Sequence, residues 1–193
     1  ADALKTPTLL VDVPQSLSVI TSEQMEEQSY QSLADILQYT PGASIGQGEG
    51  HRDQMTIRGQ NTTADFFIDG LRDDVQYFRP LYNLERVEIL RGSNALLFGR
   101  GGGGGIVNRV AKTASTKDTF TTLNTNIDTV ANTVVGIDHN VALNADQALR
   151  INAFYEHLDN NRDQYDGERF AINPTYSADL SDVTQLVLSY EYI

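Results

Sequence analysis

Few residues in this chain stand at the spacings that catalysis or metal binding needs. The three histidines stand far apart without a ligand spacing, and there is no cysteine. A thiolate zinc site, a disulfide framework and a cysteine nucleophile are therefore excluded. Asp159, Asn161 and Asp163 start like a calcium loop, but Gln164 and Phe170 stand where that loop needs glycine and glutamate. We expect no catalytic centre, no metal site and no enzyme.

A glycine run from Gly99 to Gly105, interrupted by Arg100, contains the spacing G-x-G-x-x-G. In a dinucleotide-binding site this motif follows a strand and opens a helix. Here a helix-like segment, 94–98, precedes it and a strand-like segment, 106–110, follows, so nucleotide binding is not indicated. We interpret the run as a tightly turning segment in which backbone passes close to backbone.

The charge of the chain argues against nucleic-acid binding. Its 193 residues include 14 Lys and Arg against 26 Asp and Glu, a net charge of −12, whereas phosphate contacts need clustered basic residues. No run of about 18 apolar residues occurs, so no transmembrane helix is expected. The acidic surplus is uneven, with 11 − 14 = −3 in residues 1–117 and 3 − 12 = −9 in residues 118–193.

The part before residue 118 mixes short helix and strand patterns. Thr21 or Ser22 can cap one helix and Ser32 a second, whose apolar face ends before Pro41-Gly42. Short strands are expected over 16–20, 55–58, 66–69 and 86–90. We therefore expect a compact mixed α/β unit.

The part after residue 118 alternates apolar and polar residues with period two. This is the strand pattern, and it predicts about five long antiparallel strands joined by short turns and one longer polar loop. Alternation alone leaves two interpretations open: a soluble sheet with one solvated face, or strands of an outer-membrane barrel.

A series of short motifs in the first part narrows the choice. In order, they are Val13-Pro14-Gln15-Ser16, Leu33-Ala34-Asp35-Ile36-Leu37, Tyr39-Thr40-Pro41-Gly42, Ile57-Arg58-Gly59, Ile68-Asp69-Gly70, Leu84 to Gly92, and Leu97-Phe98-Gly99 leading to Val107-Asn108. In this order and spacing they resemble the plug domain of TonB-dependent outer-membrane siderophore receptors. The resemblance predicts a mixed α/β plug domain over 1–113, then antiparallel β-strands of an incomplete transmembrane β-barrel over 118–193.

The resemblance also implies a function. Such receptors lie in the bacterial outer membrane, bind a ferric siderophore on the outer side, and import it with energy supplied by TonB together with ExbB and ExbD. The iron travels only as the chelate, so no resident cofactor is implied. The apical arginines favour an anionic chelate, whereas haem, vitamin or citrate-type ligands stay open as alternatives.

Ligand contact is implied for two segments of the plug, 44–54 and 72–82. Arginine offers charge and a planar donor fork, and aromatic rings offer stacking faces. The candidate ligand-binding residues are His51, Arg52, Gln54, Tyr77, Phe78, Arg79 and Tyr82.

The family's plug arginines pair with glutamates on the barrel wall, and Arg58 and Arg91 match them. Glu85 and Glu88 add acidic partners in the same segment, so these four residues are the candidates for a plug–barrel ion network.

A receptor of this family needs about 22 strands, and residues 118–193 provide about five. The sequence is therefore interpreted as an N-terminal portion of a longer receptor, with the TonB box upstream of Ala1. The alternative is a truncated plug that acts as a periplasmic binding module without transport.

Overall fold

The computed structural model describes residues 9, 12, 16–46, 52–92, 98–99, 103–159 and 166–193. Two compact units divide the chain, residues 1–111 and residues 112–193. The division falls two residues before the expected end of the first domain at 113. None of the described helices is long and apolar enough to cross a membrane.

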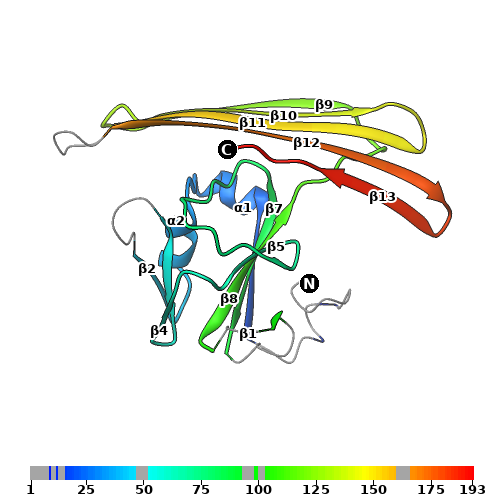
Figure 1. Cartoon of the computed structure of the whole chain (residues 1–193). Helices are drawn as coiled ribbons and strands as arrows, with labels where there is room; N and C mark the ends of the chain where they lie inside the picture. Colours follow the sequence, from blue (N-terminus) through cyan, green and yellow to red (C-terminus); the bar gives the residue numbers. More distant parts are fainter. Residues whose placement is uncertain are drawn as a thin grey trace. The chain divides into compact units, whose positions relative to one another are not determined.

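The first unit contains a five-stranded and a three-stranded sheet with two short helices (Figure 1). The five-stranded sheet has the order β1-β7-β8-β5-β6, and only the β5–β8 pair is parallel. The three-stranded sheet has the order β2-β3-β4. The elements are β1 (Ser16–Thr21), α1 (Ser22–Glu27), α2 (Leu33–Gln38), β2 (Ala43–Gly46), β3 (Gln54–Ile57), β4 (Gln60–Thr62), β5 (Phe66–Ile68), β6 (Leu71–Arg72), β7 (Leu84–Arg91) and β8 (Gly105–Ala111).

Both helices begin at the expected caps. The Thr21 side chain accepts a hydrogen bond from the Gln24 amide, and Ser32 forms a reciprocal capping box with Asp35. Each helix has only six residues, so its stability depends on packing of its apolar face. The main core of the unit joins that face to the sheets and includes Leu33, Ile36, Leu37, Met55, Ile57, Phe66, Val87, Ile89 and Val107.

The end of the glycine run packs backbone against backbone, as expected. A Cβ at Gly104 would overlap the Ile57 carbonyl oxygen, and one at Gly105 would overlap the Leu90 carbonyl oxygen. At Gly103, by contrast, a Cβ would meet no atom within 4 Å. Only a residue without a side chain therefore fits where β8 begins; Gly101 and Gly102 lie outside the described residues.

The second unit is one antiparallel sheet of long strands in the order β13-β12-β11-β10-β9 (Figure 1). Its strands are β9 (Phe120–Ile127), β10 (Thr133–Ala142), β11 (Gln147–Leu158), β12 (Gly167–Ser181) and β13 (Thr184–Ser189). The expectation of about five strands in this part agrees with these elements. The helix and strand patterns of the first part missed the short strands β2, β4 and β6, because two to four residues show too little periodicity.

A soluble sheet buries its apolar face and exposes its polar face, and this sheet does the reverse. One face exposes apolar side chains, such as Val135 (43%), Ile137 (38%) and Phe170 (58%). The other face has buried polar side chains, among them Asp138 and Asn140. An apolar outer face with a polar inner face is typical of strands in an outer-membrane barrel. It contradicts the interpretation of a soluble sheet with a solvated polar face.

Candidate functional site

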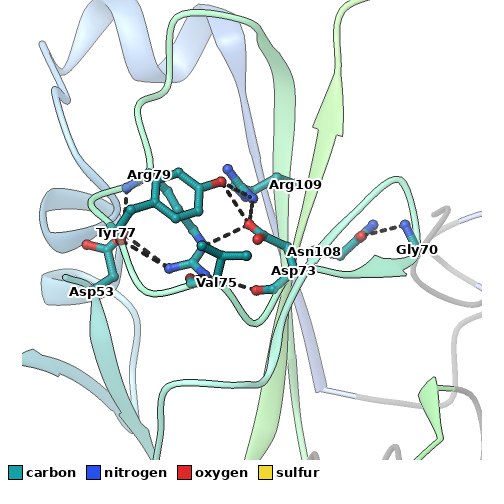
Figure 2. A network of polar contacts seen from close by, with 8 residues as sticks. All are labelled: Asp53, Gly70, Asp73, Val75, Tyr77, Arg79, Asn108 and Arg109. Carbon is teal, nitrogen blue, oxygen red and sulfur yellow. Dashed lines mark hydrogen bonds and ion pairs between the residues drawn. The ribbon is translucent and has the colours of Figure 1, made fainter. Parts of the chain in front are cut away.

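Arg79 is the centre of a buried polar network in the first unit (Figure 2). It lies in the irregular segment between β6 and β7, and its side chain is inaccessible to solvent. The guanidinium donates to the Asp73 carboxylate (3.0 Å) and to the carbonyl oxygens of Asp73 (2.9 Å), Val75 (2.6 Å) and Tyr77 (3.3 Å). It also lies 4.1 Å from the ring centroid of Phe66 and 4.6 Å from that of Tyr77. These hydrogen bonds and ring contacts of Arg79 hold the backbone of residues 73–79 in place.

Asp73 is shared by two arginines and a phenol. Its Oδ2 accepts from Arg79 Nε, from Arg109 Nη2 and from the Tyr77 hydroxyl, the last at 2.9 Å. Arg109 also donates to the Tyr77 hydroxyl at 3.2 Å. Since Arg109 belongs to β8, the carboxylate ties the irregular segment to a central strand of the sheet (Figure 2).

Asp53 ties the same segment to the residues that precede β3. The Arg79 amide donates to Asp53 Oδ2 (2.8 Å), and the Asp53 amide donates to the Tyr77 carbonyl (3.2 Å). The two segments predicted to contact ligand are therefore joined directly. We refer to Asp53, Asp73, Tyr77, Arg79 and Arg109 as the Asp73 network.

The electrostatics of the network keep Tyr77 neutral at ordinary pH. Burial raises the pKa of its phenol, Arg109 opposes this rise, and the Asp73 carboxylate adds to it. The protonated hydroxyl can therefore donate to Asp73 while it accepts from Arg109.

Most predicted ligand-binding residues in the described part are partly accessible. Arg52, Gln54, Tyr77, Phe78 and Tyr82 are half-buried, which leaves part of each side chain open to a ligand. Gln54 additionally donates to Asn61 at 2.7 Å across β3 and β4. His51 lies outside the described residues.

Arg79 differs from the other candidates because it is 2% exposed and its donors are taken by protein groups. This position does not support direct contact with a ligand. Arg79 was selected from the sequence because an arginine can bind an anionic ligand. The sequence did not indicate Asp53, Asp73 and Arg109, which form the buried network around it. The Asp73 and Arg109 side chains meet across 36 residues, so no local pattern connects them.

Arg58 and Arg91, the two arginines assigned to a plug–barrel network, meet at the Pro41-Gly42 turn. The Arg58 amide donates to the Gly42 carbonyl (2.9 Å), and Arg91 donates to the Pro41 carbonyl (3.4 Å) and to Ser16 Oγ (3.0 Å). A Cβ at Gly92 would lie 3.2 Å from Arg58 Nη1, so glycine leaves room for the guanidinium. Among the described residues, neither arginine has an acidic partner.

The backbone at Arg58 is unusual for its residue type. Arg58 and Gly59 form the two-residue turn between β3 and β4 with φ of 50° and 80°. Such turns favour Asn or Gly at the first position, so the arginine is not explained by the turn itself. Its exposed side chain is available for a partner.

The two glutamates of the predicted network differ. Glu85 is exposed on β7, whereas Glu88 is fully buried and accepts from Arg86 (3.0 Å) and Asn108 (3.3 Å) within the first unit. Among the partners of the Glu88 carboxylate are therefore a neighbour on its own strand and one on β8. Within the described ranges no three metal-binding side chains are grouped.

Comparison with known proteins gives a consistent result. The model of the family "TonB-dependent Receptor Plug Domain" matches residues 10–106. The probable TonB-dependent receptor BfrD of Bordetella pertussis is 36% identical over 95% of this chain and 25% of its own length. The probable TonB-dependent siderophore receptor PiuA of Acinetobacter baumannii is 31% identical, with the same coverage. This chain thus spans about a quarter of the length of these relatives.

Solved structures agree with the sequence relatives. The crystal structure of PiuA from Acinetobacter baumannii superposes with a TM-score of 0.86 at 29% identity, over 98% of this chain and 27% of that one. The ferric-catecholate import receptor Fiu from E. coli K12, in its open form, superposes with a TM-score of 0.87 at 25% identity, over 97% and 28%. These matches confirm the expected fold, a mixed α/β plug followed by antiparallel strands of an incomplete barrel.

Proposed function

This chain belongs to the TonB-dependent receptor plug family, and from that premise we propose that it is part of a receptor that imports a ferric siderophore across the bacterial outer membrane. TonB, with ExbB and ExbD, supplies the energy. The observation that carries the proposal is the family match over residues 10–106, followed by a sheet with an exposed apolar face and a buried polar one. Relatives named for siderophore or catecholate receptors support the choice of cargo.

We propose that the cargo touches Arg52, Gln54, Tyr77, Phe78 and Tyr82, and we keep His51 in the set on the sequence prediction alone. Their side chains combine one cation, an amide and aromatic faces, which suits a chelate with a polar rim and flat ligand groups. Arg79 is a positioning residue, because it shapes the segment that presents Tyr77 and Phe78.

We also propose that Arg58 and Arg91 pair with acidic groups of the barrel in the complete receptor. Their lack of an acidic partner in the described part supports this assignment, since a confined arginine is favourable only when it is paired. Glu85 is exposed at the other end of β7 from Arg91, and we assign it to a second contact with the barrel.

The experiment is uptake of radioactive iron by iron-starved cells that lack the gene or carry it on a plasmid. The panel contains catecholate, hydroxamate and citrate chelates, and haem. We expect the plasmid to restore uptake of one chelate class, and expect that uptake to disappear without TonB. Equal uptake of every chelate with and without the gene would refute the proposal.

Variants then test the site in the same assay. Phe78→Ala should raise the half-saturating chelate concentration by about tenfold, since one stacking contact of about 1 kcal/mol or more is lost. Asp74→Asn is the matched control, because Asp74 is an exposed neighbour outside the proposed set.

A further inference from the structure

The segment between the last strand of the first unit and the first strand of the sheet, residues 112–119, has no regular secondary structure. Segments of this kind are usually mobile connections. Here, however, side chains on the polar face of β10 and β11 bind it at successive positions, and the Thr175 hydroxyl of β12 donates to the Lys112 carbonyl (3.5 Å). Both the segment and these strands belong to the second unit.

Asp138 on β10 holds the start of the segment. Its carboxylate accepts from Lys112 Nζ at 2.9 Å, and from Arg150 Nε and Nη2 at 2.8 and 2.7 Å. The three side chains are at most 12% exposed. Removing the carboxylate would leave two cations without their partner in a poorly solvated place, and moving Lys112 away would leave Arg150 as the one cation on Asp138 among the described residues, so the arrangement favours a fixed Lys112.

Asn140, two residues along on the same face of β10, holds the middle of the segment. Its amide nitrogen donates to the carbonyls of Ser115 (2.8 Å) and Asp118, and its oxygen accepts from the Ser115 amide (2.9 Å). The side chain is fully buried. The side-chain amide of Asn140 thus pairs with backbone N–H and C=O groups of the segment, as the backbone of a neighbouring strand would.

Two more contacts complete the attachment. Arg150 Nη1 donates to the Thr113 carbonyl (3.1 Å), and the Ala142 amide donates to Thr119 Oγ1 (3.1 Å). Hydrogen bonds therefore reach the segment from its first residue to its last. Breaking one of them leaves the others in place, so the segment can be released only if several break together.

We propose that residues 112–119 are a fixed anchor on the inner face of the sheet, held chiefly by Asp138 and Asn140, and are not a hinge. Movements of the plug during import would then occur before Lys112. The statement about plug movements during import rests on the proposed function, whereas the attachment of residues 112–119 to the sheet does not.

The anchor is tested by hydrogen exchange on the full-length receptor, purified from outer membranes in detergent. We expect the Ser115 amide, within the peptide covering 112–119, to exchange slowly because it donates to Asn140 Oδ1, and Asn140→Ala to accelerate its exchange by about tenfold or more, as for the loss of at least one net hydrogen bond. Asn124→Ala is the matched control, since Asn124 is an exposed residue of β9; it should leave the peptide unchanged. Exchange of the wild-type peptide at the rate of an unstructured chain would overturn the proposal.

Cross-linking tests the consequence for import. Thr119→Cys with Ala142→Cys, in a receptor without other cysteines, can be joined by a cleavable thiol reagent with a short spacer, because Thr119 Oγ1 lies 3.1 Å from the Ala142 amide and the pair leaves Asp138 and Asn140 unchanged. Uptake should stay within about twofold of the cleaved sample, since the segment need not move. Loss of uptake on cross-linking, with recovery on cleavage, would refute a fixed anchor. Absence of uptake in both samples would instead count against the import function, and the exchange experiment would still decide the anchor.

Discussion

The Asp73 carboxylate is the charge on which the network around Arg79 depends. Two guanidinium groups, at most 2% exposed, lie against it, while Asp53 Oδ2 lies farther from Arg79, at 3.8 Å from its Nη1. Buried cations are tolerated when they are paired and hydrogen-bonded, and become costly when the partner is removed. The stability of the first unit should therefore respond more to Asp73 than to its exposed neighbours.

Replacement of Asp73 by Asn tests this dependence. The amide keeps the size of the side chain but removes its charge, so we expect the free energy of unfolding to fall by about 3 kcal/mol. Asp74→Asn, at the adjacent exposed position, should change it by less than about 0.5 kcal/mol. Urea titration of the full-length receptor, followed by a probe in the plug, measures both. Equal effects of the two variants would contradict the prediction.

Tyr77 makes the same network sensitive to alkaline pH. Burial first, with Asp73 adding and Arg109 opposing, raises the pKa of the phenol above its ordinary value of 10.0. A raised pKa means that its contribution to stability is complete below pH 10.0 and is lost as the pH rises through the folded value.

Tyr77→Phe removes this titration. We expect the free-energy difference between wild type and the variant to shrink as the pH rises through the folded pKa. The comparison cancels the other tyrosines, which both proteins share. Unfolding titrations across the alkaline range measure the difference, and a constant difference would show that Tyr77 does not titrate in the network.

At the scale of elements, the start of β8 is set by contact between backbones. Gly104 stands against Ile57, the last residue of β3, while Gly105 stands against Leu90 of β7. The entry of this strand into the sheet therefore leaves no room for a side chain. A Cβ at the neighbouring Gly103, by contrast, would meet no atom within 4 Å.

Alanine substitutions separate these two glycines. Gly104→Ala should lower the free energy of unfolding by about 1–3 kcal/mol, because backbone must move to admit the methyl group. Gly103→Ala should be neutral or slightly stabilising, since it reduces the freedom of the unfolded chain. Thermal or urea unfolding of the two variants checks the order, and a Gly103 variant as damaging as the Gly104 variant would contradict it.

At the scale of the whole molecule, the sheet of β9–β13 has one face made of exposed apolar side chains. Leu123, Ile137, Ala153 and Ile172 form one row across four strands of that face. In an outer-membrane receptor this row would face hydrocarbon. A charge placed there should oppose assembly into the membrane.

Ile137→Lys tests the orientation of the sheet. We expect it to cost about 2–4 kcal/mol if the row lies near the bilayer midplane, and so to reduce the amount of folded receptor in the outer membrane. Asn124→Lys, on the opposite face of the neighbouring strand, is the matched control and should assemble normally. The amount of heat-modifiable, protease-resistant receptor in washed outer membranes measures both. Normal assembly of Ile137→Lys would place this face away from lipid.

Local patterns were sufficient to predict much of the architecture. The caps at Thr21 and Ser32, the strand periods and the order of short motifs each depend on residues close in sequence, so the sequence by itself determined both helices, the long strands and the family. It also identified the glycine run as a place of close backbone approach, because only glycine permits one.

The tertiary structure alone decided what the polar side chains do. Arg79 has the type of a ligand-binding residue, but the folded chain buries it and engages it with Asp53 and Asp73. Glu88 was predicted from its charge and its place near Arg91, and the structure adds Arg86 and Asn108 as hydrogen-bond partners. Asn140 has no motif at all, yet it holds a segment more than 20 residues earlier in the chain. These roles depend on contacts between residues far apart in sequence, and such contacts exist only once the strands have paired.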